Sequence, residues 1–215
     1  MVKYLKRKSS FSSCKCWWYR LGLPVTILLV ICILLGCSST TPTQLYEYSE
    51  LGIKLESPEN WSVDYYERNG SIVLKAASRS PNRNSARIDI FGSTCSSTLF
   101  NPPDEALEYN IDRIRRLYDL DSITIIQEPK KFEAIDKEIV NATIQIPTTS
   151  LPEDSPGNQV GERSPNVFQV IDIFAIKYSN DELIMVYVYK GNSEQLNAEA
   201  EGIVDSIQST CSSLH

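Results

Sequence analysis

From residue 45 onward, several short stretches have apolar residues at every second position, which is the period of a half-buried β-strand. Residues 86–90 and 140–146 alternate cleanly, and Asn69-Gly70 separates two alternating stretches as a two-residue hairpin turn does. Residues 167–178 and 183–189 are apolar on both faces, so we expect them to be central strands covered on both sides. Other strands are expected at residues 46–48, 53–55, 63–68, 71–76, 123–125 and 131–132.

The spacing becomes helical after Asn101, which can cap a helix that has Pro102 in its first turn. Leu107, Ile111, Ile114 and Leu117 or Tyr118 then lie on one face of this first helix. The other side carries a basic cluster that could dock an acidic partner. We favour a solvated face, because acidic residues lie beside the arginines. The cluster is Arg113, Arg115 and Arg116, and the acids are Glu108 and Asp112.

A second helix is expected to open at Asn192, with Gln195 in the capping-box position. Its buried stripe is Leu196, Ala200, Ile203, Val204 and Ile207. Gly202 lies inside this stripe, where it costs about 1 kcal/mol relative to alanine and allows the helix to approach the sheet closely. Mostly antiparallel strands with one helix in mid-chain and one at the end indicate an α+β layered domain.

Residues 147–166 interrupt this rhythm with four prolines, two glycines and several acids, and hold almost nothing apolar. Long loops of this kind are either functional or disordered. Because the stretch has no aromatic residue that could form a binding surface, we favour a disordered loop inserted between two strands.

The N-terminal residues have the plan of a secretory signal. A basic head without acids precedes an apolar run, and that run ends at Leu34-Leu35-Gly36-Cys37. This ending resembles a bacterial lipobox, in which the cysteine is lipidated and becomes the new N-terminus. The resemblance implies that residues 1–36 are a lipoprotein signal peptide, that Cys37 carries a lipid such as palmitate, and that residues 37–44 are a flexible tether to a domain at 45–211.

The alternative is an uncleaved signal anchor, with Trp17, Trp18 and Tyr19 as an interfacial aromatic belt. Both interpretations place the domain on the extracytoplasmic side of the cell membrane, in the periplasm or at the cell surface, because positive charge stays inside. The head holds six of the 21 basic residues and none of the 27 acidic ones, so the exported part carries a net charge near −12. Such an acidic surface argues against nucleic acid as a partner.

Most of the six cysteines leave with the signal or carry the lipid, so that only Cys95 and Cys211 remain in the domain. An oxidising compartment favours a disulfide between them. Two separate thiols are the alternative, since the sequence says nothing about the distance between their Cα atoms.

The sequence offers few of the residues that catalytic sites and metal sites use most often. Its single histidine is His215, in a serine-rich tail, and it has neither Cys-x-x-Cys nor clustered glycines. The many acids, such as Glu47, Glu50 and Asp64, are typical of a solvated acidic surface. Asp172 is the exception, because it interrupts an apolar run. Such a carboxylate is either functional, or a structural acid that lies at a strand edge or is satisfied by a nearby hydroxyl. We expect the second of these, and we expect no catalytic residue, metal or cofactor.

Paired tyrosines on the strands are the best candidates for a binding face, although packing in the sheet explains them as well. They are Tyr46, Tyr48, Tyr65, Tyr66, Tyr187 and Tyr189.

The arrangement of these elements resembles the PsbP/Mog1-like family over residues 45–210. The resemblance rests on the strand Leu51–Leu55, the turn Ser57-Pro58-Glu59-Asn60-Trp61, the mid-chain helix and the closing unit Gly202–Ile207. It implies an α/β/α sandwich around an antiparallel sheet. It implies no single activity, because the fold serves several roles.

We therefore expect a lipid-anchored accessory protein without catalytic activity, which binds a membrane or envelope protein complex. The alternative is a domain that binds a small ligand or a metal. A ligand-binding domain should have a lined pocket near the tyrosines.

Overall fold

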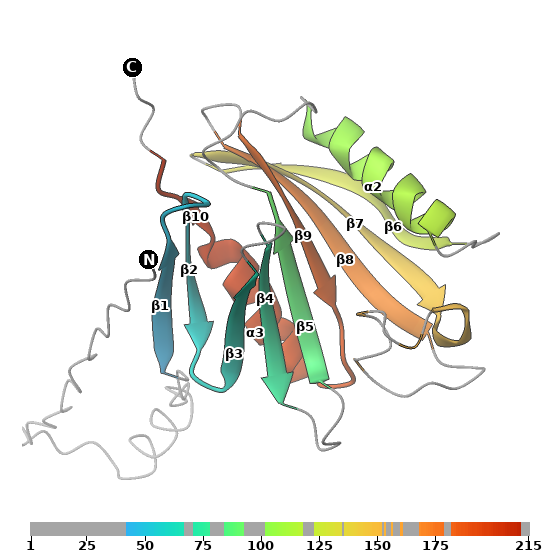
Figure 1. Cartoon of the computed structure of the whole chain (residues 1–215). Coiled ribbons are helices and arrows are strands. Elements are labelled where there is room, and N and C mark those ends of the chain that lie inside the picture. Colours follow the sequence, from blue (N-terminus) through green and yellow to red (C-terminus); the bar gives the residue numbers. More distant parts are fainter. Residues whose placement is uncertain are drawn as a thin grey trace, which may run out of the picture.

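The computed structural model describes residues 42–66, 71–77, 84–92, 102–117, 123–134, 136–151, 153, 156, 160, 168–178 and 182–211. Within these residues, a seven-stranded antiparallel sheet forms the centre of the domain (Figure 1). Its strands, in spatial order, are β3 (Trp61–Tyr66), β4 (Ser71–Ala77), β5 (Asn84–Phe91), β9 (Leu183–Tyr189), β8 (Phe168–Tyr178), β7 (Lys137–Pro147) and β6 (Thr124–Glu133).

The two stretches that are apolar on both faces are strands β8 and β9, and β9 lies in the middle of the sheet between β5 and β8. The prediction of central strands is therefore confirmed. The expected pieces at 123–125 and 131–132 are instead one ten-residue edge strand, β6, whose register against β7 shifts twice. Because the register shifts at these two points, apolar and polar residues do not alternate along β6, and the sequence did not predict one continuous strand.

A smaller sheet in the described residues has the order β1 (Thr43–Tyr48), β2 (Ile53–Pro58) and β10 (Gln208–Ser209). Strand β1 begins two residues before the expected start of the domain, so Thr43 and Gln44 belong to the sheet and not to the tether. Strand β10 was not predicted, because two residues carry no period of their own.

Two helices cover opposite faces of the large sheet, and the expected α/β/α layering is confirmed (Figure 1). Helix α2 (Pro103–Leu117) packs over β7 and β8, whereas α3 (Glu194–Ser206) packs against β5 and β2. A 3-10 turn, η1 (Thr148–Ser150), follows β7.

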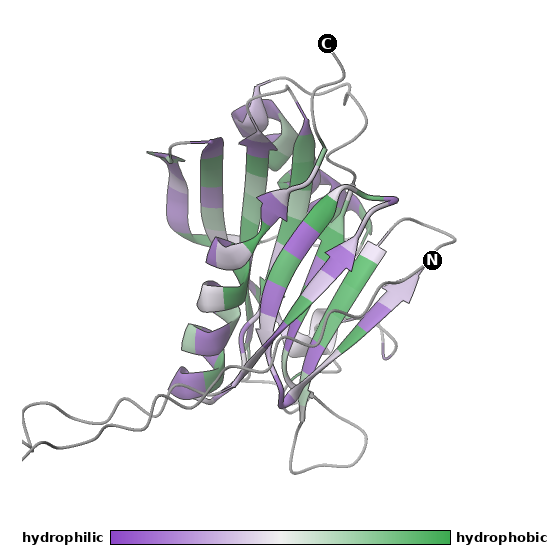
Figure 2. Ribbon diagram, turned by 90° about the vertical axis from the view of Figure 1, so that its left-hand side faces the viewer, coloured by the Kyte–Doolittle hydropathy of each residue, from purple (hydrophilic) through white to green (hydrophobic). Residues whose placement is uncertain are grey.

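Bands of hydrophilic and hydrophobic residues alternate along several strands (Figure 2). The buried side chains fall into two hydrophobic cores, one on each face of the large sheet. Along β9, Ile184, Val186 and Val188 face α3 and the smaller sheet. The intervening Met185, Tyr187 and Tyr189 face α2. Both faces are covered, which explains why this strand reads as an uninterrupted apolar run.

Both helices begin one residue later than expected. Helix α2 starts at Pro103, and the expected cap at Asn101 lies outside the described residues. The N-cap of α3 is Ser193 and not Asn192: its Oγ accepts a hydrogen bond from the backbone N–H of Leu196. Serine and asparagine cap about equally well, so the choice between neighbours was decided by the backbone path into the helix.

The expected role of Gly202 is wrong. It lies on the exposed side of α3, and a Cβ at this position would meet nothing within 4 Å. We therefore expect Gly202→Ala to raise the free energy of unfolding by about 0.5–1 kcal/mol, because alanine loses less backbone entropy on forming a helix. Urea unfolding would measure this change.

Gly191 provides the contrasting control. A Cβ there would lie 1.5 Å from the carbonyl oxygen of Ser85, so Gly191→Ala should destabilise the protein clearly. Equal effects of the two substitutions would contradict the packing described for both glycines.

The described part of the 147–166 loop is ordered at several points. Thr148–Ser150 form η1, and the side chains of Leu151 and Val160 are only 3% and 2% exposed. The prediction of disorder does not hold for these residues. The rest of the loop, together with the Asn69-Gly70 hairpin, lies outside the described residues.

Candidate functional site

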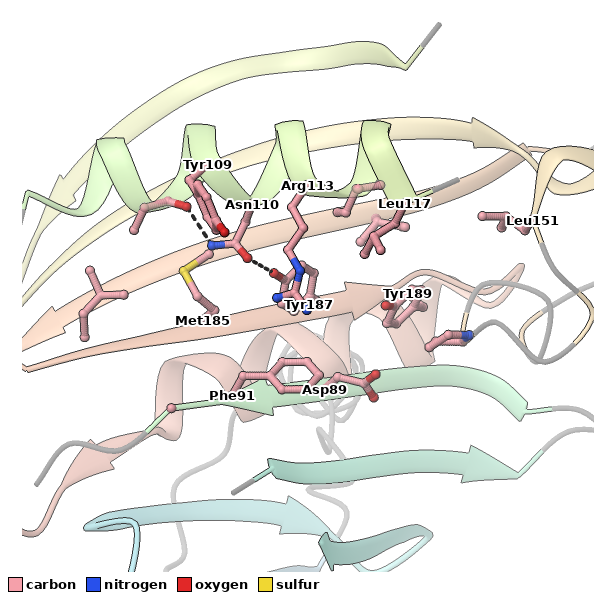
Figure 3. A pocket seen from close by; sticks show the side chains of 16 residues that line it. Asp89, Phe91, Tyr109, Asn110, Arg113, Leu117, Leu151, Met185, Tyr187 and Tyr189 are labelled. Carbon is pink, nitrogen blue, oxygen red and sulfur yellow. Dashed lines mark hydrogen bonds between the residues drawn. The ribbon is translucent and has the colours of Figure 1, made fainter. Parts of the chain in front are cut away.

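A cavity of about 600 Å³ lies on the α2 side of the sheet, between this helix and strands β5 and β9 (Figure 3). Helix α2 contributes Ala106, Tyr109, Asn110, Arg113, Ile114 and Leu117. Strands β5 and β9 contribute Asp89, Phe91, Leu183, Met185, Tyr187 and Tyr189. The wall is completed by Gly92, Leu151, Pro156 and Ile171.

The periods of the elements explain why these residues meet. Positions 106, 109, 110, 113 and 117 recur at helical spacing and form one stripe of α2. Positions 89 and 91 of β5 and 185, 187 and 189 of β9 lie on the same face of the sheet, since Asp89 pairs with Tyr187 across the two strands. Side chains from the helix and from the sheet together line the cavity.

A buried polar network joins α2 to the floor of the cavity. The hydroxyl of Tyr187 donates a hydrogen bond of 2.6 Å to Oδ1 of Asn110, whose Nδ2 donates to the carbonyl oxygen of Ala106 at 2.8 Å. Burial raises the pKa of Tyr187 to about 12, although the guanidinium of Arg113 favours the ionised form. Tyr187 is therefore a neutral phenol, and its hydroxyl proton is donated to Asn110 (Figure 3).

The carboxylate in the cavity wall, that of Asp89, already forms an ion pair with Arg87. Arg87 donates from Nε and Nη2 to the two oxygens of Asp89, at 2.6 and 3.0 Å. The side chain of Asp89 is only 3% exposed, and its burial raises its pKa even though Arg87 opposes this shift. Because the ion pair is internally satisfied, this acid is a poor candidate for a general base.

The arginine cluster of α2 separates into two kinds of residue. Arg115 pairs with Asp112 at 2.8 Å, and Nε of Arg116 donates to the carbonyl oxygen of Asp112, so both are held on the surface of the helix. Arg113 instead extends toward Tyr187 over the cavity (Figure 3). The expected solvated face holds for all three arginines, since Arg113 and Arg116 are exposed and Arg115 is half-buried, but Arg113 also lines the cavity.

The predicted tyrosine pairs have different surroundings. Tyr187 and Tyr189 line the cavity, and the ring of Tyr187 meets Phe91 edge-on, with centroids 5.5 Å apart. Tyr48 is buried in the other core, and its ring centroid lies 5.4 Å from that of Tyr65. The remaining two also lie away from the cavity: Tyr46 packs against that same core, and Tyr66 is exposed on the edge strand β3. Only the β9 pair therefore forms part of a candidate binding face.

Asp172 is a structural residue, as expected. Its Oδ1 accepts a hydrogen bond of 2.8 Å from Thr143, and its Oδ2 lies 2.6 Å from Nζ of Lys190. Lys190 also reaches Glu201 of α3, at 3.4 Å. Of the two predicted surroundings, the hydroxyl is confirmed and the strand edge is wrong, because β8 lies between β9 and β7. The lysine was missed, because it follows the next strand and only the β8–β9 pairing brings it to Asp172.

The other predicted site residues are mostly outside the described part of the chain. This holds for Cys37, Cys95 and His215. Cys211 is disulfide-bonded, and its pairing with Cys95 stays a prediction. Among the described residues, no three histidine, cysteine, aspartate or glutamate side chains gather as metal ligands would, and no described helix is long and apolar enough to cross a membrane.

The fold has a counterpart among solved structures. The solution structure of cyanobacterial PsbP (CyanoP) from Synechocystis sp. PCC 6803 matches with a TM-score of 0.50 and 10% sequence identity, over 81% of this chain and 96% of that one. The PsbP-like fold expected from the sequence is thus confirmed. No protein-family model matches the chain, and no curated protein sequence does.

Proposed function

We propose that this protein is a lipid-anchored, extracytoplasmic accessory protein that binds a membrane protein complex of the envelope and has no catalytic activity. The lipid on Cys37 would hold the acidic domain at the membrane surface, where a partner complex is within reach. The likeness to the fold of cyanobacterial PsbP is compatible with this role and does not by itself assign it.

The observation that carries the proposal is the cavity, because the described residues that line it suit binding better than catalysis. Of the described residues that line it, only Asp89 and Arg113 are charged, and the carboxylate of Asp89 is already paired with Arg87. No described lining residue is a histidine, cysteine or serine that could act as a nucleophile or proton carrier.

Large apolar side chains at the rim of the cavity favour a protein partner. Leu117 is 64% exposed, Tyr109 45% and Phe91 36%. Aromatic residues are enriched in protein–protein interfaces, and exposed apolar side chains that lie together mark interaction sites. We therefore place the partner contact at this rim.

A second candidate function is the binding of a small ligand. It is favoured by the size of the cavity, about 600 Å³, since small-molecule sites commonly measure about 300–1,000 Å³. The two functions are compatible, because a partner on the rim would cover a ligand inside.

The test is purification from the native membrane in mild detergent, followed by intact mass and identification of co-purifying proteins. We expect a mass that lacks residues 1–36 and includes acyl chains, together with a stoichiometric partner. Leu117→Gln should release that partner. Ile126→Gln, on the edge strand β6 and 53% exposed, is the matched control and should retain it.

A full-length mass without lipid would refute the anchor. Equal partner recovery with the Leu117 and Ile126 variants would show that the rim of the cavity is not the contact.

A further inference from the structure

The cavity wall carries one positive charge without a counterion in the described residues. Asp89 and Arg113 are the charged lining residues. Two hydrogen bonds from Arg87 neutralise Asp89, at 2.6 and 3.0 Å. The guanidinium of Arg113 is therefore the net charge of the cavity wall. It is positive, whereas the whole chain is acidic, with 27 acidic and 21 basic residues.

Neighbouring polar groups do not satisfy Arg113. The Asn110 side chain already accepts a hydrogen bond from Tyr187 and donates one to the carbonyl oxygen of Ala106. Tyr187 is a neutral phenol, because burial keeps its pKa at about 12. Arginine presents five N–H donors in a planar fork that matches the two oxygens of a carboxylate.

The remaining wall is apolar and partly aromatic. Phe91 and Tyr187 meet edge-on at 5.5 Å. Ile114, Met185 and Ile171 extend the apolar surface from three different elements. A ring that packs against these side chains would gain contacts both from its faces and from its edges.

We propose that the cavity binds a small organic anion with an aromatic or alicyclic body, whose carboxylate is held by Arg113. The ring of this ligand lies against Phe91, Tyr187 and Met185, and the carboxylate points toward α2. This inference rests on the second candidate function above and specifies its ligand class.

The experiment compares carboxylates with their neutral amides. The full chain, as processed by the cell, is placed in phosphatidylcholine nanodiscs and titrated calorimetrically with phenylacetate, 3-phenylpropionate and 1-naphthylacetate. The corresponding primary amides have the same shape without the charge. We expect each acid to bind at least about tenfold more tightly than its amide, as a charge-assisted bidentate contact predicts.

Three variants assign the effect to Arg113. Arg113→Gln should weaken binding of the acids at least about tenfold and leave the amides unchanged, whereas Arg113→Lys should give an intermediate loss, because lysine keeps the charge without the fork. Arg116→Gln is the control on the same helix, since Arg116 does not line the cavity. All variants share one lipid environment, so partition into lipid cancels in the comparison.

Equal binding of acids and amides, or equal losses for Arg113→Gln and Arg116→Gln, would overturn the proposal. So would the absence of heat for every compound. Each of these results leaves partner recovery from the membrane as a separate measurement. Loss of the partner in Leu117→Gln with no acid binding would therefore refute the ligand alone.

Discussion

Replacing Trp61 with alanine should lower the free energy of unfolding by about 4 kcal/mol, which is the usual cost of removing a buried tryptophan. The side chain of Trp61 is only 3% exposed and lies in the core that joins the sheets to α3. Its Nε1 donates a hydrogen bond of 2.9 Å to Oε2 of Glu199 on α3. The substitution therefore opens a cavity and detaches the turn after β2 from the helix.

Urea unfolding followed by far-ultraviolet circular dichroism measures this loss. Trp61→Phe is the control, since it keeps most of the apolar contact and removes the hydrogen bond. We expect it to cost about 1–2 kcal/mol, because Glu199 retains its bonds from Asn60 and Gln195 at 3.3 and 3.0 Å. A loss below 1 kcal/mol in the alanine variant would mean that this turn does not anchor the core.

Removing Arg87 should be nearly as damaging, at about 3 kcal/mol near pH 7, because it leaves a buried carboxylate without its partner. Asp89 is 3% exposed and accepts both of its charged hydrogen bonds from Arg87. We expect the full effect in Arg87→Met, which keeps much of the aliphatic volume. The double variant with Asp89→Asn should recover most of the loss, since an amide carries no charge to compensate.

The same pair predicts a pH dependence with a definite sign. Burial raises the pKa of Asp89 above its usual value of 3.8, with Arg87 opposing the shift. For a carboxyl group whose folded pKa is raised, the stabilisation is complete below the unfolded value and is lost as the pH rises through the folded value. Without Arg87 the folded pKa rises further, and the loss extends to higher pH.

Arg87→Met should therefore be less destabilising at pH 5 than at pH 7. Unfolding in urea at both values, with Arg87→Met/Asp89→Asn as the reference for all other titrating groups, isolates the contribution of Asp89. A penalty that is the same at both pH values would contradict the buried-charge explanation.

The chain's local periods predicted much of this fold, and each failure has a physical cause. Strand β9 matches the expected residues 183–189 because it is apolar on both faces. Strand β10 was missed, since its two residues are a strand only through pairing with Ile53 and Lys54, far away in the chain. The cap of α3 was misassigned by one residue because Asn192 and Ser193 are both good caps.

The candidate site was harder to predict than the fold. Tyr187 and Tyr189 were expected as part of a binding face, and they line the cavity. The role of Arg113 could not be read from α2, because the helical pattern shows three adjacent arginines and not which of them has a partner. Asp172 was placed correctly near a hydroxyl, whereas its lysine comes from the end of another strand.

The amino-acid sequence by itself thus determined the strand and helix types, the division of each strand into two faces and the α+β class, because these depend on neighbours within a few residues. Only the tertiary structure decided which faces meet. Strand β5 lies beside β9, although about half the chain separates them, and this pairing brings Asp89 to Tyr187 beneath α2. The cavity exists because of that long-range pairing, and no local pattern records it.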